Sequence, residues 1–265
     1  MSTLNRFFES LWTEYIASTP QALTIQSLFA EQGEEVVNDH VAFRTFNRCD
    51  FDLECFTRLF LAHGYETIDE YRFPEKHLKA RAFKHSDSTL PKVFVSELLR
   101  EELSAEHQVL MERVIKQTKV EEFTLSSFYA GRLWPMVTYQ EYLSMAVESE
   151  YAAWLLVMGL TANHFTVSVN HLQKFTSVDQ VNQFLLAHGF KLNNVGGLIK
   201  GGPEVYLAQS STLADRRLEQ FACGTQAEVP TCFYEFARRY ELPSGELFQG
   251  FVTNNASRIF DSTQR

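Results

Sequence analysis

Two histidines stand at matching points of an internal repeat, and histidine is a common metal ligand. His40 lies in the string Asp-His-Val at 39–41 and His164 in Asn-His-Phe at 163–165. Each string is followed by a nearly identical sequence, Leu-Ala-His-Gly-Tyr at 61–65 and Leu-Ala-His-Gly-Phe at 186–190. His63 follows His40 by 23 residues, and His188 follows His164 by 24. We therefore expect a duplicated module that directs one histidine from each copy to a shared centre.

Glutamates near the end of each copy add carboxylates to this set. Aligning residues 95–100 with residues 233–238 places Glu97 opposite Glu235. Two imidazoles and a carboxylate on one face can bind a divalent metal and leave coordination positions open for substrate and dioxygen. We predict His40, His164 and Glu235 as ligands, and Glu97 as a fourth ligand, a base beside the ligands or only an exposed carboxylate at a strand end. The alternative for the whole set is a degenerate duplication whose histidines hydrogen-bond the backbone.

Arg44 and Gln209 are candidates for binding a substrate. Arg44 follows His40 by four residues, and an even spacing on a strand puts both side chains on one face. A guanidinium facing a cavity needs an anionic partner, which we predict to be a substrate carboxylate, the alternative being an internal pair with Glu97 or another acid. Gln209 ends an expected strand and either hydrogen-bonds substrate or belongs to an ordinary polar strand end.

The periodicity predicts an α+β fold of paired βαβββ modules that form a curved mixed sheet around the metal site. His63 and His188 precede helix-ending glycines, where a carbonyl contact makes a structural role the better hypothesis. We expect a single domain with the following segments: N-terminal helices in 1–35, a first module at 36–98 with strands at 65–73, 79–84 and 92–98, a helical connector at 99–161, a second module at 162–240 with strands at 191–195, 203–209 and 231–236, and a tail at 241–265.

Composition excludes several classes of protein. The chain has 265 residues, 45% of them hydrophobic, which is enough for a substantial core. A net charge of −9 argues against non-specific nucleic-acid binding, which needs clustered Lys and Arg. No run reaches the roughly 18 uncharged apolar residues of a membrane span, so we expect no membrane partner and a cytoplasmic location. The four cysteines form no Cys-x-x-Cys pair, which disfavours a zinc ribbon. Whether two copies of the chain form a homodimer is left open.

Several separated strings, which together cover nearly all of the chain, resemble one known family. They are Asp-His-Val-Ala-Phe-Arg-Thr-Phe at 39–46, Tyr-x-Phe-Pro-x-Lys at 71–76, Glu-Tyr-Ala-Ala-Trp-Leu-Leu at 150–156, Asn-His-Phe-Thr-Val at 163–167 and Ile-Phe-Asp-Ser-Thr at 259–263. With the duplicated βαβββ plan, these strings are similar to those of the 2-oxoadipate dioxygenase/decarboxylase (2-hydroxyglutarate synthase) family of the vicinal oxygen chelate superfamily.

The resemblance implies an Fe(II) enzyme that uses O2 to decarboxylate and hydroxylate a 2-oxo dicarboxylic acid. It also implies that the ligands are His40, His164 and Glu235 and that Arg44 binds the substrate. Two alternatives stay open. One is a Zn- or Mn-dependent hydrolase, isomerase or lyase of the same fold, and the other is a non-catalytic module that binds a small molecule.

Overall fold

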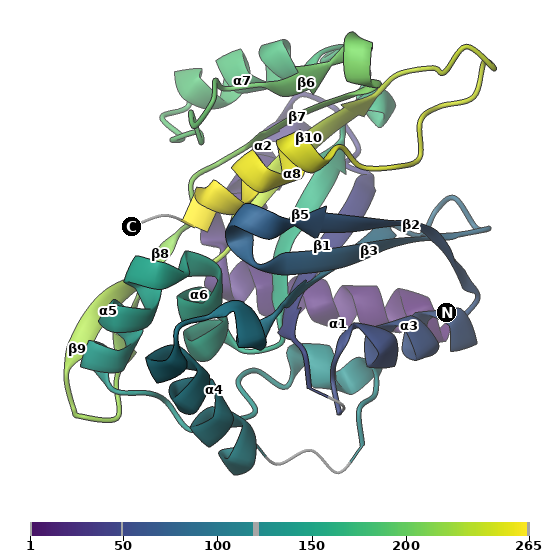
Figure 1. Cartoon of the computed structure of the whole chain (residues 1–265). Coiled ribbons are helices and arrows are strands. Elements are labelled where there is room, and N and C mark those ends of the chain that lie inside the picture. The colour runs from purple at the N-terminus through teal and green to yellow at the C-terminus, as the bar shows by residue number, and fades with distance from the viewer. Residues whose placement is uncertain (1, 49, 119–121, 264–265) are drawn as a thin grey trace.

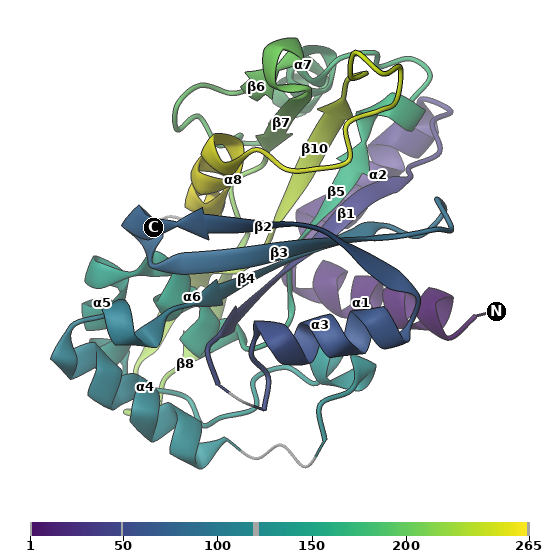
Figure 2. The ribbon, with the colours of Figure 1, turned by 45° about the vertical axis from the view of Figure 1, so that its right-hand side comes forward.

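The fold is centred on one curved sheet, and the computed structural model describes residues 2–48, 50–118 and 122–263. Within these ranges eight strands form a mixed sheet in the order β2-β3-β4-β1-β5-β10-β7-β6, which curls into a half-barrel (Figures 1 and 2). Its strands are β1 (Asn38–Phe46), β2 (Tyr65–Phe73), β3 (Leu78–His85), β4 (Lys92–Leu98), β5 (Ala162–Ser168), β6 (Lys200–Gly202), β7 (Leu207–Ser211) and β10 (Phe233–Arg239). The predicted α+β class with a curved mixed sheet is confirmed.

Two halves of this sheet meet at the antiparallel pair β1 and β5. In the first half, β1 is followed by α3 (Leu53–Ala62) and then by β2, β3 and β4, with β4 parallel to β1. In the second half, β5 is followed by α7 (Val178–Ala187), β6, β7 and β10, with β10 parallel to β5. His63 and His188 end the two helices and place Nδ1 2.8 Å from the carbonyl oxygens of Leu59 and Phe184. Their predicted structural role is confirmed.

The second half departs from the expected strand pattern. The strand expected at 191–195 is reduced to a single bridge between Leu192 and Thr212, and the one expected at 203–209 is broken by a 3₁₀ turn, Pro203–Val205. A separate hairpin of β8 (Arg216–Gln220) and β9 (Gln226–Pro230) is inserted before β10. Its strands are mostly exposed, so they carry no alternating apolar pattern from which the sequence could predict them.

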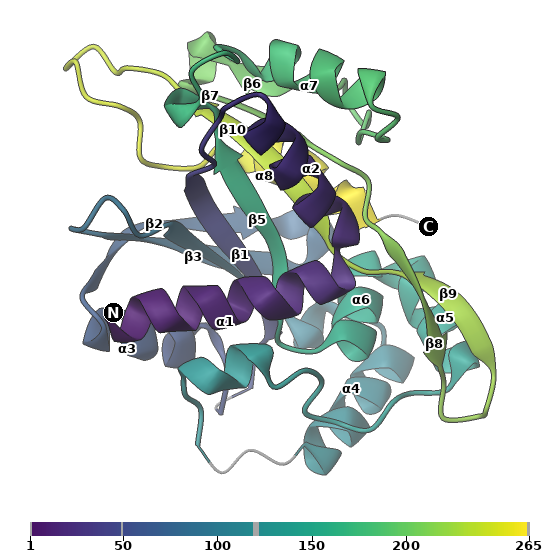
Figure 3. The same ribbon diagram turned by 180° about the vertical axis from the view of Figure 1, so that it is seen from behind.

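Helices cover the convex face of the sheet. The pair α1 (Thr3–Ser18) and α2 (Pro20–Glu31) lies across the back of β1, β5 and β10 (Figure 3), and α7 packs beside α2. The side chain of Ser2 caps α1 by accepting a hydrogen bond from the backbone N–H of Asn5, and Pro20 opens α2. Apolar side chains of α1 are buried at helical spacing, and burying each contributes about 1.5–3 kcal/mol.

The concave face is closed by segments from the middle and the end of the chain. The connector consists mainly of α4 (Ala105–Gln117), α5 (Tyr139–Glu148) and α6 (Glu150–Met158), and α6 is buried along its length. Helix α8 (Thr253–Ile259) and the 3₁₀ turn Phe260–Thr263 cross in front of β7 and β10 (Figure 1). The segment expected to be a tail therefore forms one wall of the sheet's interior.

Among the described helices, none combines the length and the apolar character that crossing a bilayer requires. Cys55 and Cys232 are buried, Cys223 is exposed, and none of these three is in a disulfide. Cys49 lies outside the described residues. The cytoplasmic location stays a prediction.

Candidate metal centre

Three predicted ligands meet on the concave face. His40, His164 and Glu235 each offer one ligand atom, these atoms lie within 4.8 Å of one another, and all three residues are buried. His164 Nε2 is 3.0 Å from Glu235 Oε2, and His40 Nε2 is 3.6 Å from Glu235 Oε1. The structure thus gathers the two histidines and one of the two glutamates singled out in the sequence.

Strand register explains why these side chains converge. On the three central strands, His40 pairs with Thr166 of β5, and Thr166 pairs with Glu235 of β10, so the three residues form one row across the sheet. His164 precedes Thr166 by two residues and therefore points to the same face. The repeat is thus sufficient to bring one histidine from each half to the same place.

His40 is held by its neighbour in sequence. A register shift in β1 between Asn38 and His40 lets the Asp39 carboxylate reach the ring, with Oδ2 2.8 Å from Nδ1. Asp39 also accepts two hydrogen bonds from Arg239, at 2.7 and 2.9 Å. Burial alone would raise the pKa of Asp39, but the Arg239 guanidinium and these hydrogen bonds outweigh it and hold the pKa well below its usual range. The ionised carboxylate fixes Nδ1–H and leaves His40 Nε2, which lies 3.1 Å from Thr166 Oγ1, as the nitrogen that can bind a metal.

His164 has an equivalent support. Its Nδ1 is 3.1 Å from the side-chain oxygen of Asn163, and its ring stacks on Phe233 at a centroid distance of 4.5 Å. Burial lowers the pKa of His164, against the opposing influence of Glu235. A neutral imidazole is the form that binds metal. The sequence contained the signal for both supports, since a polar residue precedes each histidine, but sequence reasoning assigned neither Asp39 nor Asn163 a role.

Glu235 presents an unpaired oxygen to the two histidines. Its Oε1 accepts a hydrogen bond from Gln209 Nε2 at 2.7 Å, whereas Oε2 has no hydrogen bond of good geometry. Burial would raise the pKa of Glu235, but His40, His164 and Gln209 together lower it below its usual value. A buried carboxylate with a free oxygen facing two imidazoles is costly unless a cation completes it. This donor set fits a divalent metal without specifying which one.

Gln209 is engaged within the protein. Sequence reasoning proposed that it hydrogen-bonds substrate or belongs to a polar strand end, whereas its amide bridges Glu235 and Asn255. Gln209 is only 3% exposed. Its role here is to hold the carboxylate of Glu235.

The prediction that Glu97 is a fourth ligand, a nearby base or an exposed carboxylate is wrong. Phe233 lies opposite His164, and Lys92 lies opposite His40, so the residue equivalent to Glu235 in the first half is Phe94. The sequence alignment was therefore three residues out of register, and an odd shift moves a side chain to the other face of a sheet.

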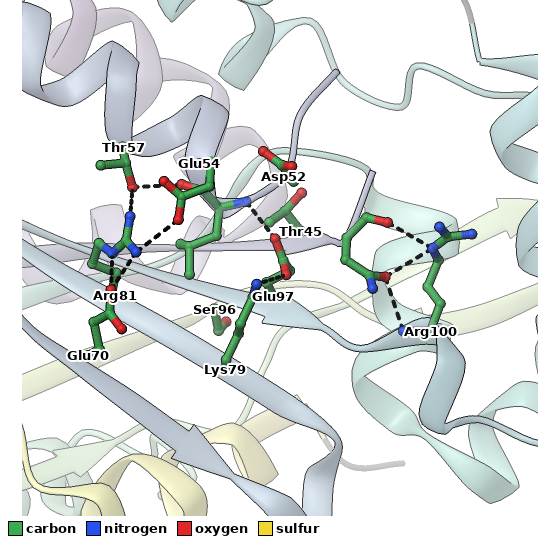
Figure 4. A network of polar contacts seen from close by, with 12 residues as sticks. Thr45, Asp52, Glu54, Thr57, Glu70, Lys79, Arg81, Ser96, Glu97 and Arg100 are labelled. Atoms are coloured by element: carbon green, nitrogen blue, oxygen red, sulfur yellow. Dashed lines mark hydrogen bonds and ion pairs between the residues drawn. The ribbon is translucent and has the colours of Figure 1, made fainter. Parts of the chain in front are cut away.

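On that other face Glu97 holds the start of a helix. The residue is fully buried, and its Oε2 accepts a hydrogen bond from the backbone N–H of Leu53, the first residue of α3, at 2.5 Å. Its Oε1 is 2.9 Å from the ammonium of Lys79, as Figure 4 shows. Glu97 is thus a structural residue that joins α3 to β3 and β4.

Arg44 lies on the same face as the three ligands and is 1% exposed. Its Nη2 donates to Thr263 Oγ1 at 3.2 Å, but its Nε and Nη1 have no hydrogen-bond partner in the described part of the chain. The guanidinium lies 4.9 Å from the ring of Tyr151 and 4.7 Å from that of Trp154. Burial lowers the pKa of Arg44 to about 10, so the side chain stays cationic at neutral pH.

This guanidinium borders a cavity of about 220 Å³. Its wall also carries the cation Lys76 and four acids, Glu75, Glu148, Glu150 and Asp261. An internal pair of Arg44 with Glu97 is excluded, because that residue occupies the opposite face and binds Lys79. The other acids near the guanidinium are Glu150 and Asp261, which line the same cavity. A buried cation with two unused donors beside a cavity is a candidate site for binding an anion. The fold therefore places a candidate metal site and a candidate anion site on one concave face.

Comparison with known proteins finds similar proteins that match nearly the whole chain. Residues 2–248 match the family model described as 2-oxoadipate dioxygenase/decarboxylase. A rice protein of that name, chloroplastic/amyloplastic, is 35% identical over 94% of this chain and 75% of its own length. The crystal structure of the rice hydroxyglutarate synthase in complex with 2-oxoadipate is 34% identical, with a TM-score of 0.92 over 97% of this chain and 91% of that one. A Shewanella frigidimarina protein described as a hydrolase is 43% identical, with a TM-score of 0.88 over 96% and 99% of the two chains.

Proposed function

Because the chain belongs to the 2-oxoadipate dioxygenase/decarboxylase family, we propose that it converts 2-oxoadipate and O2 to 2-hydroxyglutarate and CO2 at an Fe(II) centre held by His40, His164 and Glu235. The observation that carries this proposal is the presence of two complementary sites on one concave face. One is a donor set with an unpaired carboxylate oxygen, and the other is a buried arginine with two unused donors.

The two sites match the two ends of a dicarboxylic 2-oxo acid. The Cα atoms of His40 and Arg44 are separated by four residues of strand, or about 13 Å. Both side chains lie on one face of β1, so a short diacid can have its 2-oxo acid end at the metal site and its far carboxylate at Arg44. Bound Fe(II) would supply the activation of O2 and a chelating site for the 2-oxo acid.

Arg44 binds and orients the far carboxylate. Its Nε and Nη1 have no hydrogen-bond partner among the described residues, so a substrate carboxylate that reaches them gains a strong interaction in a site of low dielectric. The rings of Tyr151 and Trp154 hold the guanidinium in place, and Thr263 fixes one of its nitrogens. This preorganisation reduces the entropy lost on binding.

Aromatic side chains shield the predicted metal ligands from water. The ring of Phe251 meets that of His40 edge-on at 4.8 Å, and Phe94 lies 4.9 Å from Phe251. On the other side, Phe233 covers His164. Exclusion of water strengthens the electrostatic interactions in the site and protects a reactive oxidant from side reactions.

The family assignment favours oxygenase chemistry over a Zn- or Mn-dependent hydrolase, isomerase or lyase. It also favours an enzyme over a non-catalytic module that binds a small molecule. The test is anaerobic loading of the purified chain with Fe(II), followed by addition of 2-oxoadipate and O2. We expect O2 consumption with equimolar release of CO2 and 2-hydroxyglutarate. Iron-loaded protein that consumes no O2 with 2-oxoadipate, or a chain that is active with Zn but not with Fe(II), would contradict the proposal.

A further inference from the structure

A line of three buried amide and carboxylate side chains connects helix α8 to the metal centre. Asn255 Nδ2 donates to Gln209 Oε1 at 3.1 Å, and Gln209 Nε2 donates to Glu235 Oε1 at 2.7 Å. Asn255 Nδ2 also donates to the backbone oxygen of Leu207 at 3.1 Å. Asn255, Gln209 and Glu235 are each at most 4% exposed.

The backbone oxygen of Leu207 determines the direction of every hydrogen bond in this line. A carbonyl oxygen only accepts, so the amide nitrogen of Asn255 must face it. The same nitrogen then faces Gln209, which must turn its oxygen toward Asn255 and its nitrogen toward Glu235. The amide of Gln209 thus cannot flip without losing both of its hydrogen bonds.

The consequence at Glu235 is that its two oxygens become different. Oε1 accepts a hydrogen bond from the Gln209 amide and lies 3.6 Å from His40 Nε2. Oε2 accepts no hydrogen bond of good geometry and lies 3.0 Å from His164 Nε2. We propose that Asn255 is a positioning residue that acts through Gln209 to make Glu235 bind the metal through Oε2 alone. A carboxylate that binds through one oxygen leaves one more coordination position for the substrate or O2. This inference depends on the metal centre of the proposed function.

The backbone beside Asn255 is shaped to admit its amide. Gly201 of β6 has φ +73°, and a Cβ there would clash with both the Leu207 oxygen and the Asn255 amide. Only a residue without a side chain lets α8 approach β6 and β7 this closely. Gly201 thus makes room for the amide that fixes Gln209.

Asn255→Asp tests the relay, because it keeps the shape of the side chain and removes its donors. A carboxylate cannot donate to Gln209 Oε1, so the Gln209 amide turns and presents its oxygen to Glu235. The matched control is Asn254→Asp, the same change at the exposed neighbouring position. Asn255→Ala removes the donor without adding a charge, and serves if the aspartate variant does not fold.

The probe is Co(II), titrated into the metal-free full-length chain against a competing chelator, with the visible spectrum of the bound ion recorded. We expect Asn255→Asp and Asn255→Ala to bind Co(II) about tenfold or more weakly than wild type, with Asn254→Asp unchanged. We also expect a weaker visible band in the Asn255 variants, since a Glu235 released to bind through both oxygens raises the coordination number. In a Gln209→Leu background, Asn255→Asp should cause no further loss of affinity.

Two results would overturn the relay. One is unchanged Co(II) affinity and spectrum in both Asn255 variants, with only the melting temperature of the metal-free chain lowered, which would show a structural role. The other is an Asn255→Asp effect of equal size in the Gln209→Leu background, which would mean that Gln209 does not transmit it. If wild-type protein binds no Co(II), the metal centre itself fails and the relay with it, so the two failures are distinguishable.

Discussion

Glu235 and Phe94 occupy equivalent positions in the two halves of the sheet, two residues beyond the strand partners of His164 and His40. The duplication therefore supplies two histidines but only one carboxylate. Where the second carboxylate would stand, Phe94 packs 4.9 Å from Phe251, which covers His40. A centre with three protein ligands and an apolar neighbour keeps positions open for a substrate, as an oxygenase requires.

The two glutamates aligned by sequence should behave differently when changed. Glu235→Gln should abolish tight metal binding, because an amide is a weak ligand and only the two imidazoles remain to hold the metal. Glu97→Gln, the matched control, should retain metal but lower the free energy of unfolding by about 1–3 kcal/mol, since it weakens the buried contacts with Leu53 and Lys79. Metal content after dialysis and urea unfolding measure the two effects. Equal metal loss in both variants would argue against the observed register.

Arg44 should determine preference for a diacid. Arg44→Met removes the charge but keeps much of the apolar stem, and should lower kcat/KM for 2-oxoadipate by about 100-fold or more. Iron content should stay unchanged, because the guanidinium is not a ligand. With 2-oxohexanoate, which lacks the far carboxylate, wild type and variant should differ little. A similar loss with both substrates would mean that Arg44 supports the fold of the site and does not bind that carboxylate.

Glu148 should make stability depend on pH in the acid range. Burial alone would raise the pKa of Glu148, but hydrogen bonds from His107 and Ser104 outweigh it and lower the pKa. A lowered pKa in the folded state means that the ionised carboxylate stabilises the fold above the unfolded pKa of about 4.3, and that this stabilisation disappears as pH falls through the folded pKa.

Because Glu148 is exposed and solvent screens its contacts, Glu148→Gln should reduce the free energy of unfolding at pH 7 by less than about 1 kcal/mol. The difference from wild type should be smaller below pH of about 4. Urea unfolding of the metal-free chain at a series of pH values measures this. The control, Glu14→Gln, makes the same change at an exposed position of α1. A Glu148→Gln deficit that persists unchanged in acid would rule out ionisation as its cause.

The central site was predictable from the sequence because it repeats. His40, His164 and the helix endings at His63 and His188 recur at nearly constant spacing, and period-two alternation placed Arg44 on the face of His40. The same approach failed at Glu97, where the loops before the last strands differ between the copies. A visual alignment cannot resolve a shift of three residues, yet that shift decides which face a side chain occupies.

Contacts between segments that lie far apart in the sequence could not be predicted from it. Asp39 binds Arg239, which lies 200 residues away, and Asn255 reaches Gln209 from a segment that showed no repeat and was predicted to be a tail. These pairs depend on how α8 and β10 pack in three dimensions, for which a single sequence has no periodic signal. The residues that support the predicted ligands were therefore missed, although the predicted ligands themselves lie close together.

The most direct test of the account is a crystal structure of the chain prepared anaerobically with Fe(II) and 2-oxoadipate, with anomalous scattering measured at the iron edge. We expect one iron peak about 2.1 Å from His40 Nε2, His164 Nε2 and a Glu235 oxygen, with the far carboxylate of 2-oxoadipate on Arg44. An iron peak elsewhere, or a substrate bound with neither end at Arg44, would contradict it.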